Sequence, residues 1–287
     1  MRALAMLEPW TSDPALVWVV AAGALYAIGS RRLTRAGPTA TQRWRAASFA
    51  AGLAAILLAL DSPIDDLADK LLWVHMVQHI LLLMVAPPLL ALARPWNRMW
   101  HGFPLQLRRR VSRAVVQGPR WGPVRASAAL LAGGVASWLA FNLTLVAWHI
   151  PAAYDLTLRS QPVHALEHAM FFAVGLVFWT RVIDSPPWRS ALPATARAAC
   201  VGLALIVSWI LAIVLAVAGS PLYAPYAAEA SRPGGISALA DQQLGAGVMW
   251  VPGSIPFAIV LVVIIYRWLE PKRPRHPEGV HALPGSP

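Results

Sequence analysis

The sequence predicts an all-α integral membrane protein with seven transmembrane helices. Of its 287 residues, 57% are hydrophobic and only 13% are charged, about half the charged fraction that is usual in soluble domains. Apolar stretches follow one another along most of the chain, and each has the ~17 to 25 residues that a helix needs to cross a ~30 Å hydrocarbon core. We place the spans at about residues 14–30, 44–60, 71–93, 126–148, 164–183, 198–219 and 241–269.

The charges of the loops predict the orientation of these spans. Of the 24 Lys and Arg residues, 20 fall in segments on one side of the membrane and 4 on the other, and 10 of the 13 acidic residues fall on the side that is poor in cations. Because cytoplasmic loops carry the Lys and Arg excess, we expect the N-terminus outside and the C-terminus inside. The net positive charge then follows from topology, so we exclude nucleic acid as a partner and expect the basic run at residues 108–113 to contact anionic lipid headgroups.

We expect one membrane domain at residues 1–270 and a disordered cytoplasmic tail, rich in proline and charge, at residues 271–287. The first thirteen residues contain no apolar core, so no cleavable signal peptide is expected there. The connection at about 94–125 is expected to contain a short amphipathic helix on the inner surface. We expect proline to kink or locally open two helices, at residues 87–88 in the third span and at residues 252 and 256 in the seventh.

Five histidines are predicted to lie at one level in the outer half of the membrane. His75 and His79 in HMVQH are four residues apart, and so are His164 and His168 in HALEH, which places each pair on one face of a helix. At 1.5 Å per residue, the predicted orientation puts these side chains between the outer boundary and a depth of about 12 Å. His149 ends the fourth span at the outer surface.

This arrangement predicts a metal site. Ionisable side chains within a bilayer are costly, by ~2.5 kcal/mol or more for a charged one near its centre, so they are functional candidates. A histidine pair at this spacing can share one ion. Imidazole suits copper, zinc, iron and nickel, whereas the thioethers of Met76 and Met249 suit Cu(I). Taken singly, a histidine that bonds a neighbouring helix or a methionine that packs would explain each residue equally well.

The residues leave several chemistries open. HALEH matches the H-x-x-E-H pattern of a zinc protease, in which Glu167 would polarise water. A membrane b-type haem could instead take one axial histidine from each of two helices. A retinal protein is excluded, because it needs a lysine within the bundle and the two lysines, Lys70 and Lys272, lie outside the spans.

Several motifs together resemble a known family, the CtaG-type assembly factors of bacterial cytochrome c oxidase, in their seven-span form. The resemblance runs in the same order from about residue 50 to residue 270. It rests on the segments HMVQHILLLMVAPPLLALARPW, FNLTLVAWHIPAAYD, HALEHAMFFAVGLVFW and DQQLGAGVMWVPGS.

The resemblance implies a non-enzymatic, multi-pass protein of the bacterial cytoplasmic (inner) membrane that assists the maturation of a haem-copper oxidase. Together with the predicted metal site, it leads us to expect copper, as Cu(I), to be bound near the outer face and delivered to an oxidase subunit. The implied partners are oxidase subunits and an extracytoplasmic copper donor. A b-type haem protein in electron transfer and an intramembrane zinc protease that uses HALEH are the alternatives.

We expect the first ligands to come from the two histidine pairs, with the other polar groups at this level in additional, transfer or orienting roles. The expected first ligands are His75, His79, His164 and His168, the additional or transfer ligands are Met76, His149 and Met249, and the residues that orient the imidazoles are Glu167 and Asp241.

Overall fold

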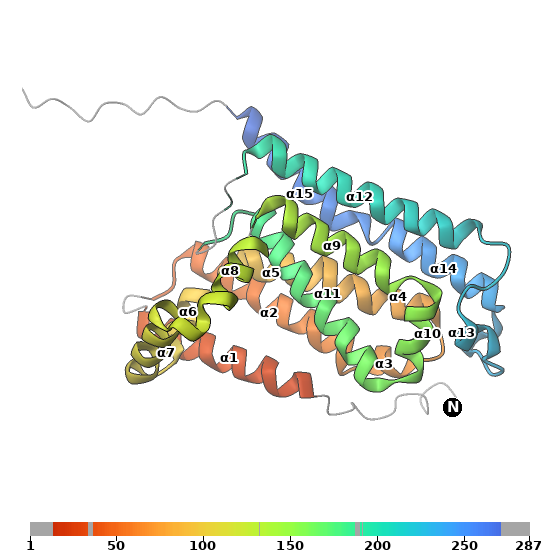
Figure 1. The fold of residues 1–287 in the computed structure, drawn as a ribbon, viewed down its shortest axis with the longest axis horizontal. Helices are drawn as coiled ribbons and strands as arrows, with labels where there is room; N and C mark the ends of the chain where they lie inside the picture. The colour runs from red at the N-terminus through yellow and green to blue at the C-terminus, as the bar shows by residue number, and fades with distance from the viewer. Residues whose placement is uncertain (1–13, 34–36, 132, 187–189, 191, 271–287) are drawn as a thin grey trace, which may run out of the picture.

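The computed structural model describes residues 14–33, 37–131, 133–186, 190 and 192–270, and among these residues it contains helices and connections but no strand (Figure 1). This confirms the all-α prediction. The longer helices are α1 (Pro14–Leu33), α2 (Ala40–Leu60), α7 (Leu105–Gln117), α9 (Gly134–Trp148), α11 (Gln161–Val182), α12 (Ala194–Val217), α14 (Ala238–Trp250) and α15 (Ser254–Leu269). The shorter ones are α3 (Pro63–Ala68), α4 (Leu72–Ile80), the π-helix η1 (Leu81–Val85), α5 (Ala86–Ala93), α6 (Trp96–Gly102), η2 (Pro119–Trp121), α8 (Gly122–Leu131), α10 (Pro151–Arg159), α13 (Ala224–Ala228) and η3 (Pro233–Gly235).

Six helical segments within the described residues are long and apolar enough to cross a membrane, and a bent pair brings the number to seven. The six are residues 15–33, 40–60, 72–93, 161–182, 194–217 and 238–269, in which α4, η1 and α5 count as one segment and α14 and α15 as another. They match six of the seven predicted spans to within a few residues. The chain is therefore a membrane protein with several apolar helices.

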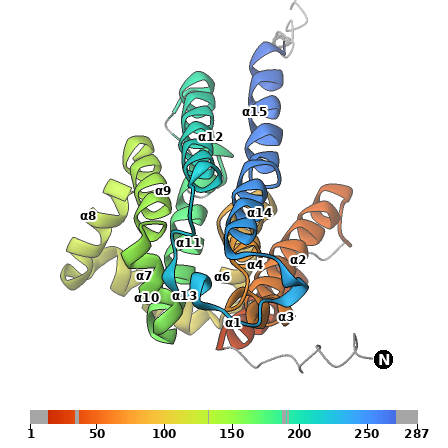
Figure 2. The same cartoon turned by 90° about the vertical axis from the view of Figure 1, so that its right-hand side faces the viewer.

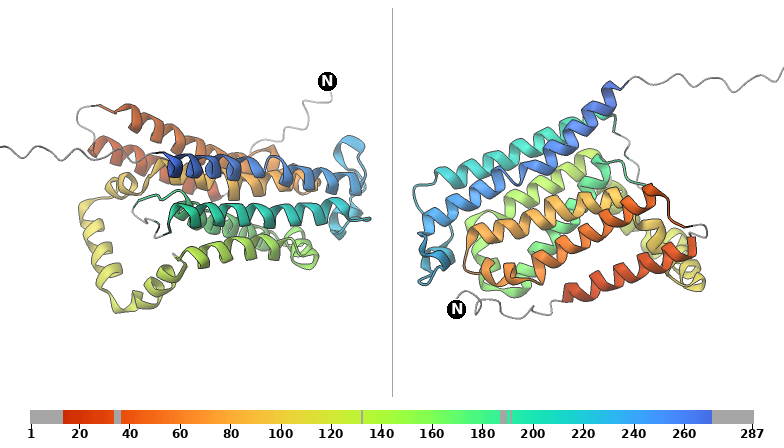
Figure 3. Two further views of the ribbon diagram at one scale, coloured as in Figure 1. Left: turned by 90° about the horizontal axis from the view of Figure 1, so that it is seen from above. Right: turned by 180° about the vertical axis from the view of Figure 1, so that it is seen from behind.

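The fourth predicted span, at 126–148, is wrong as a continuous helix. The structure ends α8 at Leu131 and begins α9 at Gly134, and the two consecutive glycines at 133 and 134 are poor helix formers. Gly134 also lies against Leu192: a Cβ atom at position 134 would lie 2.5 Å from the Leu192 side chain. Figure 3 shows α8 turning away from the bundle. The membrane-crossing candidate is instead α9 with α10, bent by 73° ahead of Pro151.

The third span opens locally at its prolines, as predicted, and a contact from α11 satisfies the carbonyl that is left free. Pro87 has no N–H to donate to the carbonyl of Leu83, four residues earlier, and the π-helix η1 lies directly before it. The indole Nε1 of Trp179 donates to this carbonyl at 2.9 Å. Gly175 allows the close approach of the helices, since a Cβ atom there would lie 2.9 Å from the same oxygen.

The seventh span is interrupted at Pro252, between α14 and α15, as the prediction of a local opening requires. Pro252 has no N–H to donate to the carbonyl of Val248, and the N–H of Gly253 donates to this carbonyl instead, at 3.1 Å. The indole Nε1 of Trp209 on α12 donates to Ser254 Oγ at 2.7 Å. The helix of this span is therefore interrupted at about its middle, where it contacts α12.

The connection after the third span forms α6, α7, η2 and α8. The amphipathic helix expected in this connection is α7, none of whose residues is buried. The predicted tail at 271–287 and the first thirteen residues lie outside the described residues.

The bundle has two unlike ends. Figures 1 and 2 show α3, α10 and α13 closing one end, where α4 and α14 begin, whereas α6, α7 and α8 lie at the other. Helix α11 runs through the middle and packs against α5, α9, α10, α12 and η1. By the predicted orientation the end with α3, α10 and α13 is the outer one, and it holds the polar residues described next.

Candidate metal centre

The N-terminal end of α4 is fixed by a carboxylate from α14. Asp241 accepts hydrogen bonds from the backbone N–H groups of Leu72 (2.9 Å) and Trp73 (3.1 Å), and Arg232 Nε lies 3.6 Å from its Oδ2. A carboxylate at a helix N-terminus satisfies free N–H groups and interacts favourably with the helix dipole. We expected Asp241 to orient an imidazole, but it holds the backbone of α4 one turn before His75.

Four side chains from α4 and α11 bring their potential ligand atoms together. His75, His79, Glu167 and His168 each offer one atom, and these atoms all lie within 4.8 Å of one another. Each residue is buried, between 0% and 6% exposed. We call these four residues the His–Glu cluster.

The spacing within the His–Glu cluster suits a metal ion better than direct hydrogen bonds. Glu167 lies 3.7 Å from His75 Nε2 and 3.5 Å from His79 Nε2, both beyond the usual hydrogen-bond length. Two ligands that are each ~2.1 Å from a tetrahedral ion are about 3.4 Å apart. The two distances between Glu167 and the histidine nitrogens are therefore close to those between the ligands of a bound ion.

A tyrosine from α13 sets the tautomer of His75. Tyr226 donates its hydroxyl proton to the carbonyl of Ala68 at 2.5 Å, and its oxygen lies 2.9 Å from His75 Nδ1. Burial raises the pKa of Tyr226 well above its usual value, so the phenol stays protonated. Since that proton is given to Ala68, His75 Nδ1 must be the donor to Tyr226. In a neutral imidazole, Nε2 then presents a lone pair to the cluster.

The carboxylate of Glu167 has no hydrogen-bond donor among the described residues. Both its oxygens are buried without a partner, as are His75 Nε2, both ring nitrogens of His79 and His168 Nε2. A lone pair that faces a carboxylate repels it, and an unpaired buried charge is costly. A cation between them, either a proton or a metal ion, removes this conflict.

The other two predicted histidines lie beside the His–Glu cluster. The ring of His164 is 4.2 Å from that of His168 and 4.9 Å from that of His75, measured between centroids, and its Nε2 has no partner among the described residues. His149 lies 5.7 Å from His79 by the same measure. Its Nδ1 donates to the carbonyl of Leu145 at 2.7 Å.

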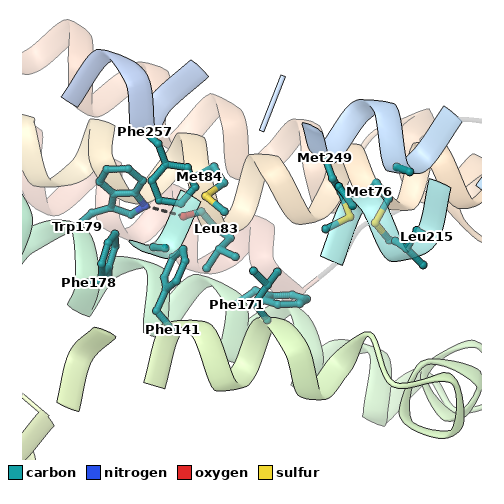
Figure 4. Packing of buried hydrophobic residues seen from close by; sticks show 14 of the residues in the cluster. Met76, Leu83, Met84, Phe141, Phe171, Phe178, Trp179, Leu215, Met249 and Phe257 are labelled. Atoms are coloured by element: carbon teal, nitrogen blue, oxygen red, sulfur yellow. Dashed lines mark hydrogen bonds between the residues drawn. The ribbon is translucent and has the colours of Figure 1, made fainter. Parts of the chain in front are cut away.

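The two predicted methionine ligands lie apart from the carboxylate. Met76 and Met249 line a small cavity between α4, α9 and α14 that also touches His79 and His149. Figure 4 shows the two methionines side by side between α4 and α14. The structure therefore divides the sequence-predicted ligands between two neighbouring places.

Sequence reasoning missed the tyrosines that surround the cluster. Tyr226 bonds His75, the ring of Tyr154 lies 5.1 Å from that of His75, and Tyr223 stacks on Tyr154 at 4.1 Å. Tyr223 also donates to the carbonyl of His149 at 3.1 Å. The segment PLYAPYA, between two spans, contains two of these three tyrosines. This pair of aromatic residues was the sequence feature that could have indicated their role.

Comparison with known proteins agrees with the motifs. The family model "Cytochrome c oxidase caa3 assembly factor" matches residues 24–271. The chain is 24% identical over 274 residues to the uncharacterized protein ML1998 of Mycobacterium leprae, which covers 90% of this chain and 40% of that protein. It is 26% identical over 259 residues to the uncharacterized protein Mb0105 of Mycobacterium bovis, which covers 86% of this chain and 37% of that protein.

The chain thus spans about two fifths of the length of these curated relatives. No solved structure matches it. The family match covers the third, fifth and seventh spans, with every residue of the His–Glu cluster inside it. The chain belongs to the cytochrome c oxidase caa3 assembly factor family.

Proposed function

We propose that this protein binds copper at the His–Glu cluster, near the outer face of the cytoplasmic membrane, and assists its delivery to an oxidase subunit. The observation that carries the proposal is the set of four buried donor residues whose ligand atoms lie within 4.8 Å of one another. The family supports the second half of the proposal, because its members assemble a cytochrome c oxidase.

The charge of the His–Glu cluster favours Cu(I) among the metals that imidazole binds. Glu167 supplies one negative charge, and neutral imidazoles supply none. A bound Cu(I) therefore makes the occupied site neutral, whereas Zn(II) or Cu(II) would leave one positive charge within the membrane. Since an uncompensated charge is costly in this environment, the monovalent ion is favoured.

The packing of the rings argues against the haem alternative. A bis-histidine haem places a macrocycle between its two axial rings. Here His75 lies 4.9 Å from His164 and 5.8 Å from His168 between centroids, so the rings of α4 and α11 contact one another directly. A macrocycle would have to separate α4 from α11.

The position of Glu167 argues against the protease alternative. In that mechanism the glutamate of HALEH polarises a water molecule at the metal. Glu167 is fully buried and faces His75 and His79 on the opposite helix, so its carboxylate is placed as a ligand or as their charge partner.

Complementation tests the proposal in the cell. A strain that lacks this protein is supplied with the wild type, with His75→Ala/His79→Ala, or with the control His101→Ala, whose side chain lies on α6 and contacts Asn97. We measure the copper bound per haem in the purified oxidase. The wild type and the control should restore it, the double variant should not, and excess copper in the medium should partly rescue the double variant. An oxidase with full copper in the double variant would refute the proposal.

A further inference from the structure

A cavity that holds only soft or neutral donors lies next to the His–Glu cluster. It has a volume of about 20 Å³, which is room for about one water molecule or ion. Its lining comes from α4, η1, α9, α12 and α14 and includes Met76, His79, Met84, His149 and Met249. No carboxylate is among the lining residues.

Two thioethers converge on this cavity from opposite helices. Met76 is fully buried on α4 and Met249 is 5% exposed on α14. The two helices are held together at their outer ends by Asp241. Gly245, one turn before Met249, brings α14 close, since a Cβ atom there would lie 3.3 Å from Met76 Cγ. Figure 4 shows Met76 and Met249 next to each other, with Met84 further along towards Phe257.

The ring of His149 is held in the tautomer that leaves a lone pair on Nε2, the form in which this nitrogen can bind a metal ion. Its Nδ1 gives its proton to the carbonyl of Leu145 at 2.7 Å, and a neutral imidazole in this tautomer carries its lone pair on Nε2. His149 Nε2 is buried and has no hydrogen-bond partner among the described residues. A buried nitrogen of this kind costs free energy unless a ligand satisfies it.

His79 belongs to both places. Its Nε2 lies 3.5 Å from Glu167 in the His–Glu cluster, and its ring also lines the cavity. Neither ring nitrogen has a hydrogen-bond partner among the described residues. Among the described histidines, His79 is therefore the one that borders both the carboxylate site and the thioether cavity.

We propose that the cavity is a second metal site, specific for Cu(I), in which Met76, Met249 and His149 bind the ion and His79 connects it with the first site. This proposal rests on the function proposed above. Thioether sulfur is a soft ligand that prefers Cu(I) over Zn(II). Because all the ligands are neutral and the surroundings apolar, the charge of the bound ion stays unbalanced there, and this cost is larger for a divalent ion than for Cu(I).

The two sites then form a short path inside the protein. Cu(I) passes from the His–Glu cluster to the cavity by exchanging carboxylate and imidazole ligands for thioethers, with His79 bound throughout. The copper stays Cu(I), so no electron donor or acceptor is needed. The two sites differ in selectivity, and only Cu(I) is accepted by both.

Copper X-ray absorption and metal counting test this proposal on the full chain in lipid nanodiscs. The protein is loaded with Cu(I) without oxygen, or separately with Zn(II). The test variant is Met76→Leu/Met249→Leu, because leucine is close to methionine in volume. The matched control is Met170→Leu, on α11 and outside the cavity.

The wild type should bind two Cu(I) ions and show sulfur among the copper ligands. The double methionine variant should bind one Cu(I), lose the sulfur signal and keep its Zn(II), which also shows that it is folded. The control should match the wild type. If the double variant does not fold, two other measurements test the proposal. The wild type should show sulfur among its copper ligands, and the single variant Met249→Leu should show a weaker sulfur signal.

Other results overturn the proposal in distinguishable ways. Copper bound only through nitrogen and oxygen in the wild type would remove the second site and leave the first intact. Two Cu(I) ions in the double variant would do the same. A wild type that binds no copper would refute both this site and the function proposed above.

Discussion

The His–Glu cluster and the aromatic core of the same bundle are both buried, yet they satisfy their polar atoms differently. The aromatic core comprises Phe141, Phe178, Trp179 and Phe257, with ring centroids 4.4 to 6.5 Å apart (Figure 4). Its polar atom, the indole Nε1 of Trp179, donates to the carbonyl that Pro87 leaves free. In the His–Glu cluster the rings are as close, but the donor atoms at its centre have no partners among the described residues.

This difference separates residues that stabilise the fold from residues that, on the function proposed above, bind a metal ion. A protein fills a core with groups that satisfy one another, because an unsatisfied buried polar group costs ~1 to 3 kcal/mol. The His–Glu cluster concentrates several such groups at one point. A metal ion would satisfy them together, so the effect of the four variants below on copper binding should become smaller with increasing distance from that point.

The largest effect is expected from Glu167→Gln. The amide has nearly the same shape as the carboxylate but lacks its charge, so Cu(I) would leave an unbalanced positive charge in the membrane. We expect the copper affinity of the His–Glu cluster to fall by more than about 100-fold, beyond the range seen when only a supporting contact is lost. Competition with a Cu(I) chelator measures the affinity. The control Glu229→Gln changes an exposed carboxylate that bonds Ser231 and should have no effect.

A smaller effect is expected from Tyr226→Phe. The variant removes the oxygen that accepts the His75 Nδ1 proton, so the ring loses its fixed tautomer and orientation. Loss of such a supporting bond typically lowers metal affinity by ~10 to 100-fold. Tyr223→Phe is the control, since this hydroxyl bonds the backbone of His149 and no imidazole nitrogen. Equal copper affinity in Tyr226→Phe and the wild type would show that Tyr226 does not orient His75.

Asp241→Asn should act through the helix rather than through the metal. An amide has one acceptor oxygen and carries no charge, so the variant loses one of the bonds to Leu72 and Trp73 and the ion pair with Arg232. We expect a loss of about 1 to 2 kcal/mol in stability, as for other lost N-caps, and only a several-fold loss of copper affinity. Thermal unfolding in detergent and the chelator competition measure the two. A 100-fold loss of affinity with unchanged stability would place Asp241 in direct contact with the ion.

Trp179→Phe should leave copper binding unchanged. It removes the hydrogen bond to Leu83 and opens a cavity in the aromatic core, which should cost about 1 to 3 kcal/mol of stability. The melting temperature should fall while the copper content of the folded protein stays at the wild-type value. A loss of copper that does not follow unfolding would remove the distinction between the two regions.

The spans could be read from the sequence because each has to bury its own backbone in lipid, which imposes a long apolar run. The fourth span could not, since residues 126–148 are predominantly apolar and the break depends on Gly133 and Gly134 and on the contact of Gly134 with Leu192. Apolar composition reports that a segment avoids water, and it does not report whether the segment enters the bundle.

Half of the candidate site could likewise be predicted. The i, i+4 spacing placed His75 with His79 and His164 with His168, and the predicted topology put both pairs at one level. The contacts that divide the ligands into two places join residues far apart in the sequence. Tyr226 meets His75 across 151 positions and Asp241 meets Leu72 across 169, so no local pattern contains them.

The copper content of His75→Ala/His79→Ala tests the central claim most directly. The wild type, this double variant and the control His101→Ala are purified in detergent after growth with copper, and the metal in each is counted by mass spectrometry. We predict copper in the wild type and in the control, and a loss of most of it in the double variant, because two of the four residues of the His–Glu cluster are gone. Equal copper in all three folded proteins would contradict the account.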